Sequence, residues 1–421
     1  LPGGIFNDLT NLLELDLSRN QLVSFQADLF IGLVSIQRLD ISQNLISSLN
    51  REVMVTLMSL RIFNMSGNPR LEKVDLETFD DNSYMTELHT DAYKFCCVAS
   101  QVELCTPEAD EFSSCEDLMA NYPLQISIWV LGVCAFVGNL FVIVWRVKTD
   151  RKKVPSFFII NLGCSDFLMG VYLLIIASVD VYYRGNYILN ADAWRSSFLC
   201  QLAGVLAMLS SEVSVFILTI MTLDRALAII YPLKMVNFRL RHARIIVAAV
   251  WLIGLFLSIL PTFGIPYFGV AFFGRTGELL RETQVNFQRV CLPFQISNDK
   301  VAGWEYSVFI FLILNLVSFI IIFIGYVSIF LRIKSSWKDM QHAKSTDNNE
   351  YELAKKLVLI VATDFVCWVP IILIGFAALA GAKISPAISA WIAVFILPLN
   401  AAMNPLLYTV SALDCSGLVC L

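Results

Sequence analysis

Residues 212–232 read EVSVFILTIMTLDRALAIIYP, an apolar helix that ends with an adjacent acid and base, Asp224 and Arg225. A charged side chain at bilayer depth costs at least about 2.5–3.5 kcal/mol, so this pair belongs at an aqueous face or inside a helical bundle. At the cytoplasmic mouth of a bundle, Asp224 would neutralise Arg225 and form a latch that a signal could open. The alternative is an arginine that snorkels to anchor a helix end.

The bulk composition identifies a membrane protein. Of 421 residues, 57% are hydrophobic, and the mean hydropathy is +0.68, which is too high for a soluble chain of this length. Seven apolar segments of spanning length predict a mainly α-helical bundle of seven transmembrane helices. They lie at approximately 125–145, 156–180, 199–230, 244–263, 305–331, 354–380 and 386–408. The chain begins at Leu1 inside a repeat, so we expect a fragment whose targeting signal lies upstream or was removed.

The N-terminal part carries a 24-residue repeat. Its apolar and asparagine positions are Leu12, Leu15, Leu17, Asn20 and Leu22, then Ile36, Leu39, Ile41, Asn44 and Ile46, then Leu60, Phe63, Met65 and Asn68. This is the signature of leucine-rich repeats, and we predict an α/β solenoid over residues 1–86. Each repeat contributes one strand, and each asparagine satisfies backbone groups in the turn that follows.

Polar side chains alternate with the apolar strand positions and should line the open concave face: Glu14, Asp16, Arg38, Asp40 and Asn64. Glu14, Asp16 and Asp40 suit a basic peptide, so one interpretation is a ligand-binding surface. The other is a solvated sheet face. Asn64-Met65-Ser66 is a glycosylation sequon, and a sugar there would compete with a ligand.

A cysteine-rich hinge is predicted over residues 87–122. Its four cysteines, Cys96, Cys97, Cys105 and Cys115, should staple a segment too polar to fold alone. Together with Cys200 and Cys291 they make six cysteines outside the cell, which permits full pairing but leaves the connectivity open.

Basic residues fix the expected orientation. Lysine and arginine are concentrated in the loops at 146–153, 234–244 and 332–356, which we therefore place in the cytosol. The prediction is a multi-pass plasma-membrane protein with an extracellular N-terminus, a membrane domain at 123–410 and a short cytoplasmic tail at 411–421. Arg225 then lies at the cytoplasmic end of the third helix.

Polar residues deep within the apolar helices should face one another, because each would otherwise be desolvated without a partner. They are Asn139, Asp166, Ser214, Asp364, Asn400 and Asn404. Such a set either holds a sodium ion or a proton, with Asp166 at its centre, or is a hydrogen-bonded packing network. Pro370 and Pro405 each remove a helix hydrogen bond and predict kinks that act as hinges or are simply bends.

Several motifs of the membrane part resemble those of the rhodopsin-like G-protein-coupled receptors in order and spacing. They are Gly138-Asn139, Leu162 to Asp166, Asp224-Arg225, Trp251, Cys367 to Pro370 and Asn404 to Tyr408. Within that class the chain is similar to the leucine-rich-repeat receptors. Trp368 before Val369-Pro370, and Phe395 to Asn400, resemble the relaxin-family peptide receptor branch and its invertebrate relatives.

The resemblance implies roles only where residues match. It implies a Cys200–Cys291 disulfide, a sodium-type network of Asn139, Asp166, Ser214, Asn400 and Asn404, and an activation switch. The switch residues are Asp224, Arg225, Tyr326, Asp364, Trp368, Pro370, Asn404, Pro405 and Tyr408. Two features depart from the pattern: Ala226 stands where an aromatic residue is usual, and the tail lacks a basic amphipathic helix.

The predicted function is a receptor for a peptide or protein hormone, with an insulin-like or relaxin-like peptide as one candidate ligand. Implied partners are heterotrimeric G proteins, arrestin and membrane lipid, but not nucleic acid. The alternatives are a self-activated receptor whose aromatic second outer loop, Phe263 to Trp304, acts as a tethered agonist, and an adhesion protein anchored by the bundle. The seventh segment contains no lysine for a retinal Schiff base, and we expect no enzymatic activity, no metal site beyond sodium and no cofactor.

Overall fold

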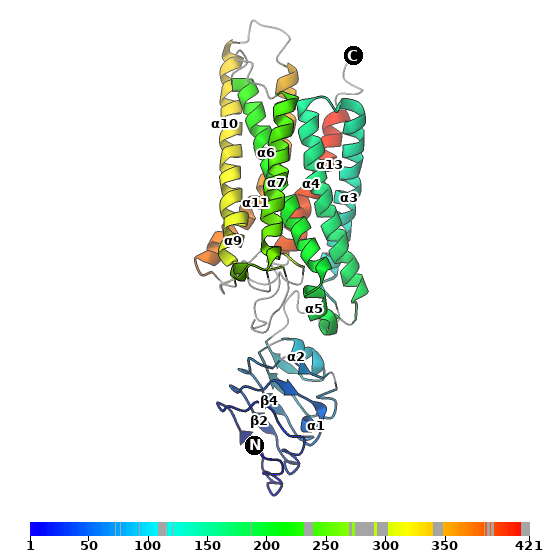
Figure 1. The fold of residues 1–421 in the computed structure, drawn as a ribbon, viewed down its shortest axis with the longest axis vertical. Helices are drawn as coiled ribbons and strands as arrows, with labels where there is room; N and C mark the ends of the chain where they lie inside the picture. Colours follow the sequence, from blue (N-terminus) through cyan, green and yellow to red (C-terminus); the bar gives the residue numbers. More distant parts are fainter. Residues whose placement is uncertain are drawn as a thin grey trace. The chain divides into compact units, whose positions relative to one another are not determined.

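The computed structural model describes residues 1–71, 73–75, 77–91, 93–107, 115, 117–119, 121–185, 187–230, 239–268, 272–273, 290–292, 302–339, 348–382, 384, 388 and 391–413. Side chains at 73, 188, 189, 192, 333–339, 348–361 and 408–413 lie outside this description, as does that of the predicted switch residue Tyr408. The chain forms two compact units, one mainly from residues 1–120 and the other mainly from residues 121–421 (Figure 1).

The first unit is a leucine-rich-repeat solenoid, as the repeat predicted. Its main sheet is parallel, in the order β1 (Glu14–Asp16), β2 (Arg38–Asp40), β4 (Ile62–Asn64), β6 (Glu87–His89) and β7 (Leu104–Thr106). The 24-residue period appears directly in the strand register, which pairs Leu15 with Leu39 and Leu39 with Phe63. A second parallel pair joins β3 (Ser48–Leu49) to β5 (Lys73–Val74), and the short helices are α1 (Arg51–Met54) and α2 (Tyr93–Val98).

Buried asparagines connect successive repeats. The Asn68 amide donates to the carbonyls of Ile41 (3.1 Å) and Met65 (2.9 Å), and its oxygen accepts from the Ile46 N–H (3.1 Å). Asn44 makes the equivalent bonds one repeat earlier. One side chain thus satisfies backbone groups of two repeats, which would otherwise be buried without partners.

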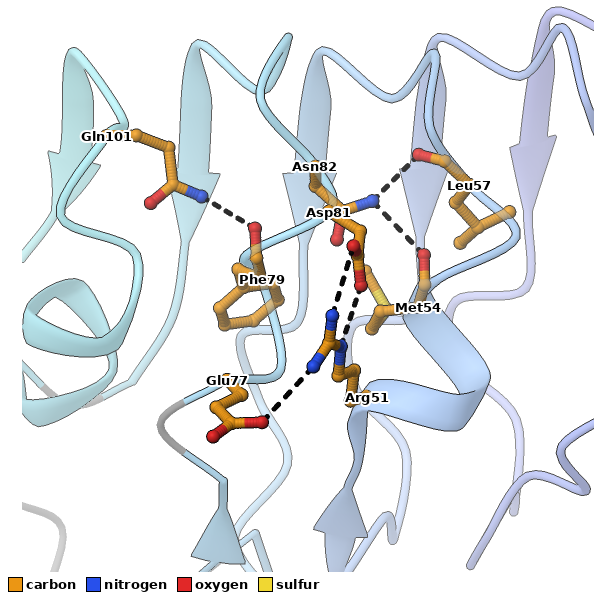
Figure 2. Close-up of polar contacts among 8 residues, drawn as sticks. All are labelled: Arg51, Met54, Leu57, Glu77, Phe79, Asp81, Asn82 and Gln101. Carbon is orange, nitrogen blue, oxygen red and sulfur yellow. Dashed lines mark hydrogen bonds and ion pairs between the residues drawn. The ribbon is translucent and has the colours of Figure 1, made fainter.

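Other polar contacts join repeats on the side of the solenoid that carries α1 (Figure 2). Arg51 binds Asp81 through two nitrogens (2.8 and 3.2 Å) and Glu77 through a third (3.2 Å). Buried Asn82 donates to the carbonyls of Met54 (3.1 Å) and Leu57 (2.8 Å). These contacts fix the distance between neighbouring turns of the solenoid.

The repeat sheet extends beyond residue 86, where we placed the start of the hinge. Strands β6 and β7 add to the same sheet, in register with β4. Disulfides join Cys96 to Cys105, which lies in β7, and Cys97 to Cys115. The cysteine-rich segment is therefore the closing part of the solenoid, so the boundary at residue 86 falls inside one folded unit.

The second unit is a bundle of long apolar helices. They are α3 (Tyr122–Asp150), α4 (Val154–Tyr182), α6 (Phe198–Ile230), α7 (Leu240–Ile259), α9 (Trp304–Val308) continued by the π-helical turn η5 (Phe309–Leu314) and α10 (Asn315–Asp339), α11 (Asn348–Leu379), and the π-helical turn η7 (Ile392–Ile396) continued by α13 (Leu397–Leu413). Shorter elements of this unit are η2 (Leu260–Phe263) and η3 (Pro266–Phe268), and the chain also contains the short helix α5 (Tyr187–Arg195).

In the described part of the chain, six helices are long and apolar enough to cross a membrane, and a shorter apolar helix spans Ile392–Leu407. These seven lie where the hydropathy pattern predicted them. Helix α6 packs against α4, α7, α10 and α11, so it has a central place in the bundle. Between α3 and α4 the backbones approach so closely that a Cβ on Gly170 would lie 2.5 Å from the Phe136 nitrogen.

Candidate functional site

The acid–base pair near the C-terminal end of α6 is intact. The Arg225 Nε donates to Asp224 Oδ2 at 3.0 Å, and a second guanidinium nitrogen contacts the same oxygen. The side chain of Asp224 is 3% exposed and that of Arg225 is 11% exposed. Tyr326 of α10 lies within electrostatic range of Arg225 and interacts with Thr222 of α6. The structure therefore brings together three of the predicted switch residues at one end of the bundle.

A second polar cluster surrounds Asp166 on α4. One carboxylate oxygen accepts from the Ser214 hydroxyl of α6 (3.3 Å), and the other accepts from the Asn404 amide of α13 (2.8 Å). All three side chains are buried. Three helices are thus joined through one acidic group, next to Pro405 in α13.

The remaining polar residues do not join this cluster directly, although we expected one mutually facing set. Asn400 of α13 donates to Asp364 of α11 at 2.7 Å. Asn139 of α3 donates to the backbone carbonyls of Ala135 (2.8 Å) and Ala401 (2.9 Å). The six residues therefore form three separate contacts.

Unused oxygens determine what these contacts could bind. Within the described residues, Asn139 Oδ1, Asn404 Oδ1 and one oxygen of Asp364 are buried without a hydrogen-bond partner. Carboxylate, hydroxyl and amide oxygens are hard ligands that suit small, hard cations. Around Asp166 itself, the carboxylate, the Ser214 hydroxyl and the unpaired Asn404 oxygen are ligands of the kind that a cation such as sodium uses.

An aromatic group lies beside Pro370. The ring of Trp368 is 1% exposed and lies 6.2 Å from that of Phe319 on α10, which meets Phe365 edge-on at 5.6 Å. Pro370 lies inside α11, two residues after Trp368. A movement of α11 at this proline would repack these rings against α10.

The second outer loop is held down at the N-terminal end of α6. A disulfide joins Cys200 of α6 to Cys291, the pair that the resemblance implied. The Tyr172 hydroxyl of α4 donates to the Val290 carbonyl at 3.0 Å, a contact that the sequence did not predict. A Cβ on Gly204 would lie 2.4 Å from the Cys291 carbonyl oxygen, so only glycine permits this approach.

Aromatic residues of the same loop are buried. Phe272 and Phe273 are each less than 5% exposed, and Phe272 packs edge-to-face against Phe268 at 5.1 Å. Tyr306 of α9 completes the group at 5.0 Å from Phe268. The described part of the loop thus fills space with its own side chains.

On the repeat sheet, the strand register places Glu14 beside Arg38 and Asp16 beside Asp40. Hydrogen bonds from Ser18 hold the pKa of the Asp16 carboxyl below its ordinary value, which keeps it ionised. Two adjacent aspartates therefore present negative charge, with Arg38 as the one neighbouring cation among these four residues.

The sequon asparagine is engaged in the same row. Asn64 donates to Asp40 Oδ2 at 2.9 Å, and its oxygen accepts from the Ser66 hydroxyl at 2.7 Å. The sequon side chain thus lies next to Asp40 in the row of strand positions that begins with Asp16. Glycosylation of Asn64 stays a prediction.

One buried acid was not among the predicted site residues. Glu212 of α6 accepts from the Asn315 amide of α10 at 3.3 Å, and both residues are fully buried. The available signal was the acid itself, which lies in an apolar helix two residues before Ser214. Its partner could not be identified, because the π-helical turn before Asn315 shifts the helical phase.

Comparisons with known proteins agree with this architecture. Residues 138–408 match the family described as 7 transmembrane receptor (rhodopsin family), and residues 1–46 match Leucine rich repeat. G-protein coupled receptor GRL101 of Lymnaea stagnalis is 48% identical over 328 residues, which is 78% of this chain and 28% of that protein.

Two further relatives are named as receptors for the hormone relaxin. Relaxin receptor 1 of Mus musculus is 34% identical over 78% of this chain and 42% of its own length. Relaxin receptor 2 of Canis lupus familiaris is 34% identical over 81% of this chain and 45% of its own length. The chain thus spans less than half the length of these relatives.

Proposed function

Because the chain belongs to the rhodopsin family of seven-transmembrane receptors, we propose that it transmits the binding of an extracellular peptide hormone to heterotrimeric G proteins. The observation that carries this proposal is the buried Asp224–Arg225 pair at one end of α6. We place that end in the cytosol because the loops at this end of the bundle are rich in lysine and arginine. The repeats are then extracellular, and the helical bundle spans the plasma membrane.

The proposed ligand is a basic peptide of the insulin or relaxin type. Two features support it: the names of the relaxin receptors among the relatives, and the acidic row of the repeat sheet. Opposite charges across an interface speed association and favour the matching partner. Replacing exposed Glu14 with arginine should therefore weaken binding of a labelled relaxin-like peptide, whereas Glu52→Arg, on α1, should not. Equal effects of both changes would contradict the assignment of this face.

The proposed mechanism is a population shift between a resting and an active bundle. Ligand on the repeats would act through the cysteine-rich segment and the outer loops, and the helices would move at Pro370 and Pro405 until Arg225 leaves Asp224. A shift from 1:99 to 99:1 requires about 5.5 kcal/mol of differential binding, which a large peptide interface is able to supply. Arrestin is a further proposed partner of the same active state.

The test is ligand-driven nucleotide exchange by the Arg225→Ala variant. We expect loss of exchange, because the freed guanidinium is the proposed contact to the G protein. Arg244→Ala is the matched control, since it removes the same charge from an exposed position near the start of α7. Undiminished exchange in Arg225→Ala at equal surface expression would overturn the latch.

We also propose that sodium binds at Asp166 and stabilises the resting state. The buried acceptor of Asn404 and the Ser214 hydroxyl support this site. Replacing potassium chloride with sodium chloride should then lower basal exchange in the native chain but not in Asp166→Asn. An identical salt response in both would leave the cluster as a packing network.

A second candidate function is self-activation by the second outer loop. The burial of Phe272 and Phe273 favours it, because these rings fill space that a separate ligand would otherwise use. Basal exchange without added peptide, lost in Phe273→Ala, would support this alternative over a hormone receptor.

A further inference from the structure

A buried carboxylate and a buried amide meet between α6 and α10 at Glu212 and Asn315. Both side chains have no exposed surface. The Asn315 Nδ2 lies 3.3 Å from Glu212 Oε1 and also 3.3 Å from the Phe311 carbonyl oxygen. One amide group therefore supplies both contacts, and both distances are at the long end for hydrogen bonds.

Two buried oxygens at this contact are unpaired within the described part of the chain. Glu212 Oε2 and Asn315 Oδ1 have no hydrogen-bond partner among the residues that the structure describes. The NH2 group of the amide is the only donor of the pair when Glu212 is ionised, and a protonated Glu212 adds its O–H as a second donor. The contact therefore holds α6 and α10 together more weakly than a fully paired one would, because each unmet buried group opposes the closed arrangement.

The position of the pair couples it to the proposed switch. Asn315 directly follows the π-helical turn η5, and such turns interrupt regular helices, frequently at functional sites. Further along the same helices, a Cβ on Gly325 would lie 2.6 Å from the Thr222 methyl, and Tyr326 lies within electrostatic range of Arg225. A change in how α10 lies against α6 at Asn315 therefore reaches the Arg225 end of the bundle.

We infer that Glu212 and Asn315 form an activation-sensitive joint between α6 and α10, whose hydrogen bonding sets how readily α10 moves and hence the resting activity. The inference rests on the proposed receptor function and adds a control point to it. Neither residue is part of the latch or of the Asp166 cluster.

Two substitutions of nearly equal volume should act in opposite directions. Glu212→Gln places a permanently uncharged amide opposite Asn315, so two amides can form a doubly hydrogen-bonded pair that closes the joint. Asn315→Asp removes the amide donor and opposes two carboxyl groups, which opens the joint. Asn315→Leu also removes the donor and serves as a second opening variant that folds without a second buried acid.

The experiment measures hydrogen exchange and nucleotide exchange on the full chain. In purified protein, amides of residues 309–319 should exchange about three- to tenfold more slowly in Glu212→Gln, the factor that one net hydrogen bond produces. They should exchange faster in Asn315→Asp and Asn315→Leu. Ser258→Ala is the control, since it removes a buried hydroxyl that, among the described residues, bonds to Gly254 of the same helix α7 (2.7 Å).

In membranes, basal loading of a GTP analogue on a panel of G proteins should fall in Glu212→Gln and rise in the Asn315 variants at equal surface expression. Both assays unchanged in Glu212→Gln, or changes of the same sign in all variants, would overturn the joint. Absence of G-protein loading by the native chain, with or without relaxin-like peptide, would refute the proposed function instead. The amide exchange result would still decide whether the joint exists.

Discussion

Replacing Asp224 with asparagine tests the latch through a magnitude that follows from the structure. The substitution keeps the shape of the side chain but removes its charge, so Arg225 retains only a neutral acceptor. Hydrogen bonds between charged groups are about twice as strong as neutral ones. Because both side chains are nearly buried, the resting state should lose about 1–2 kcal/mol.

That loss translates into basal signalling. A change of 1–2 kcal/mol alters a two-state ratio by a factor of about 5–30. We therefore expect basal loading of a GTP analogue to rise several-fold in membranes that carry Asp224→Asn, after normalisation to surface expression. The control is Asp150→Asn, which breaks a more exposed ion pair with Lys153 (2.8 Å) that should contribute little. Unchanged basal loading in Asp224→Asn, with normal surface expression, would refute the reasoning.

Two further predictions concern the repeat unit. Asn68→Ala leaves the Met65 carbonyl and the Ile46 N–H unpaired, whereas the Ile41 carbonyl keeps its bond from Asn44. It should destabilise the solenoid by about 2 kcal/mol, seen as faster amide exchange in residues 38–46, whereas Asn20→Ala, at an exposed position, should have little effect. The Arg51 contact lowers the pKa of the Asp81 carboxyl from its ordinary value of 3.8. The contact therefore stabilises the folded solenoid fully above pH 3.8, and this stabilisation is lost as the pH falls through the lowered pKa. The stability difference between the native chain and Arg51→Ala, measured by thermal unfolding, should therefore shrink on acidification; a difference that grows would contradict this sign.

The sequence predicted the repeats well because their register is local. Three copies with asparagine at a fixed position determine the strand pairing, the turn and the buried row at once. The last two strands were missed because the period changes: β6 follows β4 by 25 residues and β7 follows β6 by 17. The repeat after Asn68 also lacks the asparagine of the motif, and the side chain of Asp91 accepts from the Asn68 N–H at 2.9 Å.

The helices of the bundle were equally predictable, but their polar contacts were not. Hydropathy gives the length of a helix and leaves its rotation about its axis undetermined. Asp364 and Asp166 were expected in one set, yet Asp364 pairs with Asn400 and Asp166 with Asn404, four residues further along α13. The π-helical turn before Asn315 adds a residue to one turn, so α-helical periodicity cannot show that Asn315 faces Glu212.

The spacing of polar residues along α6 explains why this helix is able to connect the proposed control points. An α-helix turns by about 100° per residue, so Ser210 and Ser214 lie on one face, and both bond to α4. Glu212 lies about 200° from each of them and meets α10 on the opposite face. A rotation of α6 would therefore change the Asp166 cluster and the Glu212–Asn315 joint together. A lateral movement of α10 would open the joint and leave Asp166 unchanged. The sodium response should consequently persist in Asn315→Leu, and its loss there would indicate that α6 rotates rather than that α10 moves alone.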